Sequence, residues 1–339
     1  MRRTHKAKTG MGSVFAALNP QTSSRDSILN HWTKGAYWQS LATGRAAIIS
    51  VMHHYGARKI WLPSYICDDV YQALYLAGFE IDWYGVDQSL DVVIATLDQV
   101  AGGEAVLCVD YFGRSADEAL RGLAARRQDV IWIEDRAQAL SPEAASFGKA
   151  VIYSPRKLFG IGSGAIVVSQ DPFEVAITDE VQADLWACHE ARQSDPDGLR
   201  PQTWYSLFSQ RENAFDGRAR PMDLRSLEAI NKAGWKKEAK RRRDNWASLA
   251  EGLSHWALWP LASVDFVPLS YPICVPDAAE LVAKLAKDSI WCARHWSYLP
   301  SPERFIDAHH LKTRCLSLPL DGRYTHRDMR RLITAVTQL

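Results

Sequence analysis

The sequences VIWIED at residues 130–135 and AVIYSPRK at residues 150–157 decide the fold. Each begins as an apolar run of strand length and ends in side chains that can do chemistry. Asp135 closes the first run, and Lys157 follows the second. In open α/β sheets, ligands bind beyond the carboxyl ends of the strands. The two segments therefore predict neighbouring strands that bring a carboxylate and an amine to one rim of a sheet.

Strand-like and helix-like segments alternate on both sides of this pair. Further strands are predicted at residues 59–62, 79–86, 105–110 and 164–168, the last one antiparallel to its neighbour. Helices are predicted from residue 43 and at residues 68–77, 90–100, 116–127 and 224–253. Strands that alternate with helical segments of about ten residues indicate an α/β fold with a mainly parallel central sheet between helices.

The pattern changes near residue 256, where short strands surround a predicted helix at 277–287 and a closing helix at 325–337. This change indicates a small α+β domain at the C-terminus. We therefore expect an N-terminal arm at residues 1–24, a large α/β domain at 25–250 and a small C-terminal α+β domain at 251–339.

Composition excludes several classes of protein. The chain has 339 residues and a formal net charge of +1, so no long-range field favours nucleic acid or an anionic membrane. No apolar run is long enough to span a bilayer, and the basic first ten residues lack the apolar core of a secretory signal. The basic run at 236–243 is interpreted as a solvated helix face rather than a nucleic-acid site.

The cysteine and histidine patterns predict neither a disulfide framework nor a metal site. Six cysteines are scattered without C-x-x-C spacing, so we expect reduced thiols and a cytoplasmic protein. The pair His309-His310 lacks a third placed ligand, so we expect no metal.

An aspartate and a lysine at one sheet rim match the needs of pyridoxal 5'-phosphate (PLP). The lysine forms a Schiff base with the cofactor, and the carboxylate pairs with its pyridinium nitrogen. Gln138 lies one helical turn beyond Asp135 and is a candidate donor to the ring hydroxyl. Taken alone, Lys157 would be a solvated lysine and Asp135 a helix cap or surface partner. Lys149 precedes its strand and should lie at the opposite edge of the sheet.

The cofactor's phosphate requires exposed backbone amides and hydroxyl groups. Thr43, Gly44 and Arg45 open a predicted helix, whose first amides point at an anion. Ser154 can add a hydroxyl from the strand that leads to Lys157.

In order and content, these segments resemble the DegT–DnrJ sugar aminotransferases, a family of fold-type I PLP enzymes. The similarity covers residues 40–170 well and the remainder loosely. It is carried by TGRAAI at 43–48, LPSYIC at 62–67, VDYFG at 109–113, EDRAQA at 134–139 and YSPRK at 153–157. The sequence differs from the family in having Gly162-Ser163-Gly164 at a Gly-rich strand start and no clear Asn-x-Arg element near residues 218–222.

The resemblance implies a fold-type I PLP-transferase-like fold, a homodimer with shared active sites, and roles for individual residues. Lys157 would bond the cofactor and move protons. The residues implied around the cofactor are Asp135 at the pyridinium, Gln138 at the ring oxygen, Ser154, Thr43, Gly44 and Arg45 at the phosphate, and Cys67 at the ring face. Tyr111 and His295 are the implied substrate contacts, and a packing role for His295 remains an alternative.

The resemblance implies transamination from glutamate or glutamine to a nucleotide-linked keto-sugar, for polysaccharide or amino-sugar metabolite synthesis. Two alternatives remain open at this point. One is a PLP enzyme of the same fold that acts on a non-sugar ketone or catalyses dehydration. The other is a non-catalytic regulator that retains the fold.

Overall fold

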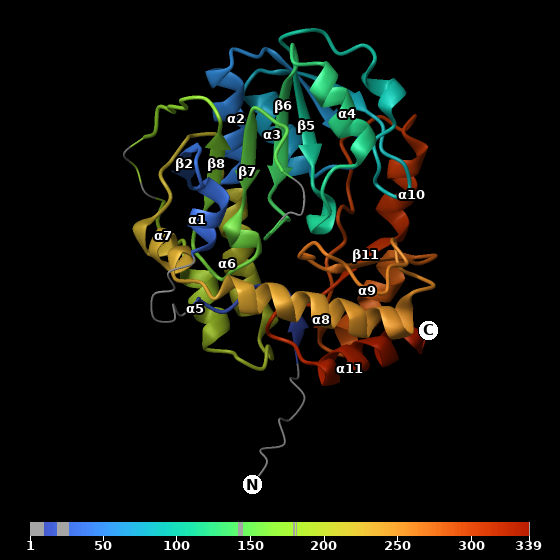
Figure 1. Ribbon diagram of the computed structural model, residues 1–339. Coiled ribbons are helices and arrows are strands. Elements are labelled where there is room, and N and C mark those ends of the chain that lie inside the picture. The colour runs from blue at the N-terminus through green and yellow to red at the C-terminus, as the bar shows by residue number, and fades with distance from the viewer. Residues whose placement is uncertain (1–9, 19–26, 142–144, 179, 181, 339) are drawn as a thin grey trace.

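The fold centres on a seven-stranded sheet with strand order β2-β8-β7-β6-β5-β3-β4 (Figure 1). The computed structural model describes residues 10–18, 27–141, 145–178, 180 and 182–338. The strands are β2 (Tyr37–Leu41), β3 (Lys59–Pro63), β4 (Glu80–Tyr84), β5 (Ala105–Val109), β6 (Ile131–Arg136), β7 (Ala150–Tyr153) and β8 (Ala165–Ser169). Strand β8 is antiparallel to β2 and β7, and all other neighbouring pairs are parallel. The predicted mainly parallel α/β sheet is confirmed.

Helices cover both faces of this sheet. Successive side chains of a strand point to opposite faces, and both faces carry apolar residues that have to be buried. Ile131 and Ile133 pack toward α2 (Gly44–His54) and α3 (Asp68–Leu76). Trp132 packs on the other face, in a core that includes residues of α4 (Glu118–Arg126) and α8 (Trp235–Leu253). The same face is completed by α1 (Ile28–Thr33) and α7 (Leu224–Asn231). Helices α5 (Ala187–Gln193) and α6 (Pro201–Asn213) pack against each other, and Glu212 of α6 pairs with Arg45 of α2.

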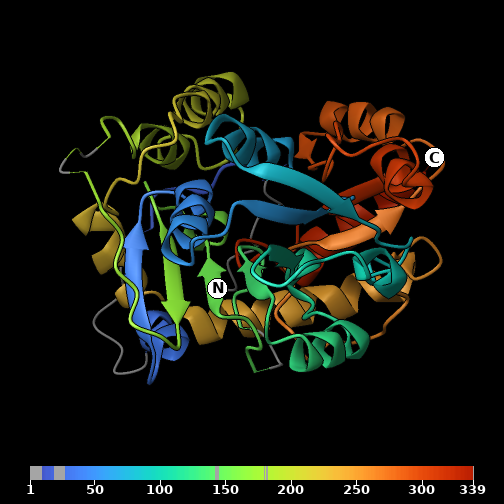
Figure 2. The ribbon, with the colours of Figure 1, turned by 90° about the horizontal axis from the view of Figure 1, so that it is seen from above.

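In the C-terminal part, as far as the structure describes it, one short two-stranded sheet packs with three helices. Strands β9 (Tyr271–Cys274) and β11 (Cys315–Leu318) are antiparallel. They pack with α9 (Ala278–Lys287), α10 (Ile306–Arg314) and α11 (His326–Thr337) in the orange and red region of Figure 2. Helix α8 contacts α11 and continues the core from the large sheet into this region. The boundary at residues 250/251 stays a prediction.

The described part of the predicted N-terminal arm is packed rather than free. Strand β1 (Met11–Gly12) pairs with β10 (Ile290–Trp291), and Met11 is fully buried. The Gly12 N–H also donates to the Tyr324 hydroxyl over 2.6 Å. Residues 1–9 and 19–24 of that prediction lie outside the described residues.

The helix predicted at residues 90–100 is wrong. The Asp87 carboxylate accepts the N–H groups of Ser89 and Asp91, and Leu90 has a positive φ of 63°. An aspartate that caps its own backbone competes with helix formation. A single bridge between Val86 and Val92 and a short 3-10 helix at Ile94–Leu97 follow instead.

The helix predicted at residues 224–253 is two helices, α7 and α8. Helix α7 ends at Asn231, and Gly234 precedes the first residue of α8. Glycine disfavours a helix interior by about 1 kcal/mol relative to alanine, which explains the interruption. Among the described residues, no helix is long and apolar enough to cross a membrane.

Candidate active site

The carboxylate of Asp135 lies at the end of β6, on the sheet face that α2 covers. It follows the alternation of Ile131 and Ile133, and one of its oxygens accepts the Ala137 N–H over 2.9 Å. Burial raises the pKa of Asp135 above its ordinary value, and the positive charge of Lys157 acts in the opposite direction. The two side chains therefore lie within electrostatic reach of each other, as the strand ends predict.

Lys157 ends a short 3-10 helix, Pro155–Lys157, that follows β7, and its side chain is exposed. Its charge also acts on Cys67, at the start of α3, and on His295, in the segment after β10. Burial, followed by Asp69, raises the pKa of the Cys67 thiol, and Lys157 opposes this shift. Lys157 thus lies within electrostatic range of Asp135, Cys67 and His295. Lys149 lies at the opposite end of β7, where its backbone N–H donates to the Trp132 carbonyl over 2.9 Å.

His295 is half-buried and neutral at physiological pH. Burial, reinforced by the charge of Lys157, lowers its pKa to about 4. Its Nδ1 lies 2.7 Å from the Ser317 hydroxyl, and its ring meets the Phe112 ring edge-on with centroids 5.7 Å apart. A neutral imidazole can exchange hydrogen bonds beside the lysine without adding a second positive charge.

Gln138 and Tyr111 stand beside this cluster with part of their hydrogen-bonding capacity already used. The Gln138 Oε1 accepts the Phe112 N–H over 2.7 Å, which leaves the amide NH₂ to donate. The Tyr111 hydroxyl donates to the Tyr65 carbonyl over 2.5 Å, and the ring is buried at 5% exposure. The Tyr111 ring packs against Trp296. Tyr111 therefore builds the wall of the site, and its contact with a substrate stays a prediction.

The backbone of Gly164 connects Ser154 to the residue before the Thr43 cap of α2. The Gly164 N–H donates to the Ala42 carbonyl over 2.8 Å, and the Gly164 carbonyl accepts the Ser154 hydroxyl over 3.4 Å. Thr43 caps α2, accepting the Ala46 N–H on its hydroxyl at 3.2 Å.

The first turn of α2 has the donors and the space that a phosphate requires. The first N–H groups of a helix have no partner within the helix. A Cβ placed on Gly44 would meet no atom within 4 Å, so the space beside these amides is open. The amides of this turn and the Thr43 hydroxyl therefore fit a phosphate group, and Ser154 would join them by turning its one O–H from the Gly164 carbonyl. Asp135 and Lys157 fit the pyridine end of PLP.

The Arg45 side chain belongs to a separate charged cluster. Arg45, Arg156 and Arg211 all pair with Glu212 on α6. The Glu212–Arg45 separation is 3.4 Å, and the arginines overcome burial and lower the pKa of Glu212 to about 2. The guanidinium of Arg45 therefore points to Glu212, which leaves its backbone amide for a phosphate. This cluster lines a small pocket beside Thr43. Sequence patterns did not reveal it, because Arg211 and Glu212 lie far along the chain from Arg45 and Arg156.

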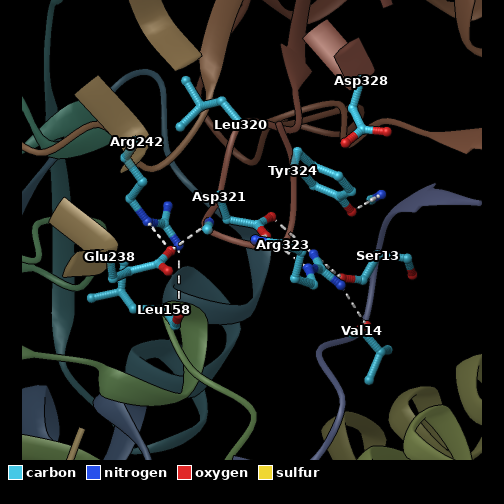
Figure 3. A network of polar contacts seen from close by, with 12 residues as sticks. Ser13, Val14, Leu158, Glu238, Arg242, Leu320, Asp321, Arg323, Tyr324 and Asp328 are labelled. Atoms are coloured by element: carbon cyan, nitrogen blue, oxygen red, sulfur yellow. Dashed lines mark hydrogen bonds and ion pairs between the residues drawn. The ribbon is translucent and has the colours of Figure 1, made fainter. Parts of the chain in front are cut away.

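A buried arginine of α8 supports the segment that carries Lys157 (Figure 3). Arg242 is fully buried and donates to the carbonyls of Leu158, at 3.5 Å, and Leu269, at 2.8 Å. It also pairs with Glu238 at 2.7 Å, and Glu238 accepts the Gly322 N–H at 2.9 Å. The basic run of α8 is therefore not simply a solvated face. Its second arginine, Arg242, links the residue after Lys157 to the C-terminal region.

The neighbours of Asp135 on β6 form a buried ion network on the opposite face of the sheet. Arg136 pairs with Glu134 at 2.6 Å and with Asp110 at 3.4 Å. Glu134 also accepts the N–H groups of Phe147 and Gly148, in the turn before β7. Glu134 and Arg136 thus hold β6 and β7 in position while Asp135 faces the site. No group of three or more metal-binding side chains occurs among the described residues.

His189 should make the protein less stable as the pH falls from 7 to 5. Its Nδ1 lies 2.9 Å from the Phe15 carbonyl and its Nε2 lies 3.0 Å from Arg211. Because a guanidinium only donates, Nε2 must accept and the ring must be neutral. Burial lowers the pKa of His189 to about 4. An unfolded histidine binds its proton near pH 6.5, so the stabilisation is complete above that pH and declines as pH falls toward 4.

The expected loss from this histidine is about 2 kcal/mol between pH 7 and pH 5. Urea unfolding of the wild type and of His189→Gln at the two pH values measures it. The variant should lose less stability than the wild type by this amount. An identical pH dependence in both proteins would contradict the neutral, buried imidazole.

Comparisons with known proteins find likeness at the level of structure. No family model matches the chain, and no curated protein matches it by sequence. A DegT DnrJ EryC1 StrS aminotransferase from Brucella abortus aligns with a TM-score of 0.64 and 17% identity, over 91% of this chain and 87% of that one. A sugar aminotransferase from Micromonospora echinospora aligns with a TM-score of 0.61 and 16% identity, over 96% and 100% of the two chains. DesI, solved in the presence of its TDP-sugar product, gives 0.62 and 16%, over 97% and 94%. At this identity, the likeness establishes the fold, which is the one that the sequence predicts.

Proposed function

We propose that this protein is a PLP-dependent aminotransferase that moves an amino group from an amino acid to the keto group of a sugar. One arrangement carries the proposal: Asp135 and Lys157 reach one rim from adjacent parallel strands and interact electrostatically there. The open first turn of α2 lies on the same face of the sheet. An acid, an amine and an anion site at one rim suit PLP and few other ligands.

Different residues would bind different parts of the cofactor. Lys157 would bond its aldehyde carbon, Asp135 would hold the proton on its ring nitrogen, and Gln138 would donate to its ring oxygen. The amides at the start of α2, with the Thr43 and Ser154 hydroxyls, would take the phosphate. When bound, PLP supplies an electrophilic carbon and a ring that accepts the electron pair of the substrate carbon.

Lys157 would also act as the acid–base group of the reaction. Its Nζ would remove the proton from the α carbon of the amino donor and deliver it to the carbon that comes from the cofactor's aldehyde. In the second half-reaction the same amine moves the proton in reverse. Asp135 would stay paired with the ring nitrogen throughout. Neutral His295 lies within reach of Lys157 as a candidate contact for the substrate.

The proposed substrate class is supported by the compared structures, which include a sugar aminotransferase and an enzyme solved with a TDP-sugar product. We therefore propose a keto-sugar as acceptor, linked to a nucleotide, with glutamate or glutamine as donor. We also propose a homodimer whose partner subunit completes the site, since fold-type I relatives share their sites in this way.

The purified protein should take up PLP and show an absorbance band of a protonated imine. Adding glutamate or glutamine should bleach this band, and adding a nucleotide-linked ketosugar should restore it and yield an aminated sugar by mass spectrometry. The donor half-reaction alone tests amino transfer without knowledge of the sugar. A band that no amino acid bleaches, together with loss of water from a ketosugar, would favour dehydration. Protein that takes up no PLP would favour a non-catalytic regulator.

A further inference from the structure

Two cysteines face each other across the small antiparallel sheet of the C-terminal region. Cys274 is the last residue of β9 and Cys315 the first residue of β11, and the register places them directly opposite. Directly opposite residues of an antiparallel pair project from the same side of the sheet. Both thiols are free, Cys315 buried and Cys274 half-buried.

The backbone hydrogen bonds identify the type of this pair. The Val275 N–H donates to the Arg314 carbonyl at 3.0 Å, so the next pair along is hydrogen-bonded. The Cys274 N–H instead points away from β11 and donates to the Trp256 carbonyl at 2.7 Å. Hydrogen-bonded and non-hydrogen-bonded pairs alternate along antiparallel strands. Cys274 and Cys315 therefore form a non-hydrogen-bonded pair, in which Cα atoms lie about 4.5 Å apart, within the range that a disulfide spans.

We propose that Cys274 and Cys315 are a site of reversible oxidation and form an intramolecular disulfide when the protein meets a low-molecular-weight disulfide. The strands already hold the two sulfur atoms opposite each other, so little of the backbone has to move.

The reactivity of the six cysteines favours this pair. The Cys315 thiol lowers the pKa of Cys274 below its ordinary value, and the charge of Arg314 adds to the effect. The pKa values of the other five thiols are all raised, that of Cys292 to about 12 by burial. Because the thiolate is the nucleophile, Cys274 should react first.

The oxidation proceeds by two exchange steps. The Cys274 thiolate attacks one sulfur of the small disulfide, whose S–S bond breaks and releases one thiolate. That thiolate takes the proton of the Cys315 thiol. The Cys315 sulfur then attacks the Cys274 sulfur, forms the new S–S bond and releases the second small thiolate, which takes up a proton from water. Two protein thiols are oxidised, and one small disulfide is reduced to two thiols.

The disulfide would link the two ends of a chain segment that contributes to the candidate site. The chain between β9 and β11 includes α9, β10, α10 and the segment of His295. Ser317, two residues beyond Cys315, holds the His295 ring at 2.7 Å. The Tyr65 hydroxyl lies beside the Cys315 thiol. A cross-link here should raise the melting temperature by roughly 5 °C, because it constrains a loop of about forty residues in the unfolded chain.

Treatment of the full chain with oxidised glutathione tests the proposal. After denaturation and alkylation with N-ethylmaleimide, intact mass should show two fewer alkylated thiols, and proteolysis should yield one cross-linked peptide that joins residues 274 and 315. Dithiothreitol should reverse both changes. Alkylation of both cysteines after oxidation, or glutathione retained on Cys274 with Cys315 still free, would overturn the proposal.

Variants separate this pair from the other thiols. Cys274→Ser should lose both the cross-linked peptide and the rise in melting temperature, whereas Cys292→Ser should keep both. Cys292 is the matched control because it lies within the closed segment and is also half-buried. A rise in melting temperature that survives in Cys274→Ser would contradict the assignment even if another thiol were oxidised.

Discussion

Lys157→Ala should lower kcat/KM for amino transfer by roughly 10⁴-fold, the largest effect we expect from one substitution. The change removes both the group that bonds the cofactor and the base that moves the proton at the substrate carbon. Alanine in place of an exposed side chain should leave the fold intact. Steady-state kinetics with the donor and acceptor of the wild-type reaction measures the loss.

The matched control is Lys149→Ala, at the opposite end of the same strand. Lys149 lies beside Tyr55, with its Nζ 5.8 Å from the ring centroid, and far from the rim that carries Asp135. This variant should keep wild-type kinetics within a factor of two or so. Comparable activity in Lys157→Ala and Lys149→Ala would contradict the catalytic role of Lys157.

Asp135→Asn should lower kcat by roughly 10²–10³-fold while leaving the imine bond to Lys157 able to form. The amide has the same shape but cannot hold the proton on the ring nitrogen by charge, so the ring accepts electrons less well. The substitution also removes a carboxylate whose pKa burial already raises. Single-turnover bleaching of the cofactor band with glutamate or glutamine separates this chemical step from cofactor uptake.

Asp129→Asn is the control for this substitution. Asp129 is exposed just before β6, at the other end of the strand that delivers Asp135, and it pairs with Arg127 at 2.9 Å. Its loss should leave the bleaching rate unchanged. If Asp135→Asn bleached at the wild-type rate, the carboxylate would have no role at the ring nitrogen.

Patterns in the sequence predicted the parts of the fold that local physics controls. The apolar runs at 131–133 and 150–153 have strand length and form buried strands, so the polar residues that follow emerge at the strand ends. The cap at Thr43 is also local, since a hydroxyl beside a helix start can be recognised from neighbouring residues. Asp135 and Lys157 could be predicted because each follows a recognisable strand and has a side chain that PLP needs.

Such local patterns could not predict contacts between segments that lie far apart in the sequence. Glu212 gathers arginines from α2, from the segment after β7 and from its own helix, and nothing in its neighbourhood marks it. Arg242 looks like one member of a solvated basic run, yet tertiary packing buries it against the carbonyl of Leu158. The helix predicted at residues 90–100 failed because the Asp87 side chain takes the backbone N–H groups that a helix would need.

The site of covalent cofactor attachment is the most direct test of the central claim, that Asp135 and Lys157 hold one ring between them. The wild-type protein loaded with PLP is reduced with borohydride, digested, and mapped by mass spectrometry. We predict a pyridoxyl phosphate group on Lys157 alone, with attachment unchanged in Asp135→Asn but its absorbance band shifted by loss of the ring proton. Attachment at Lys149 or another lysine, or no stoichiometric attachment, would contradict the claim.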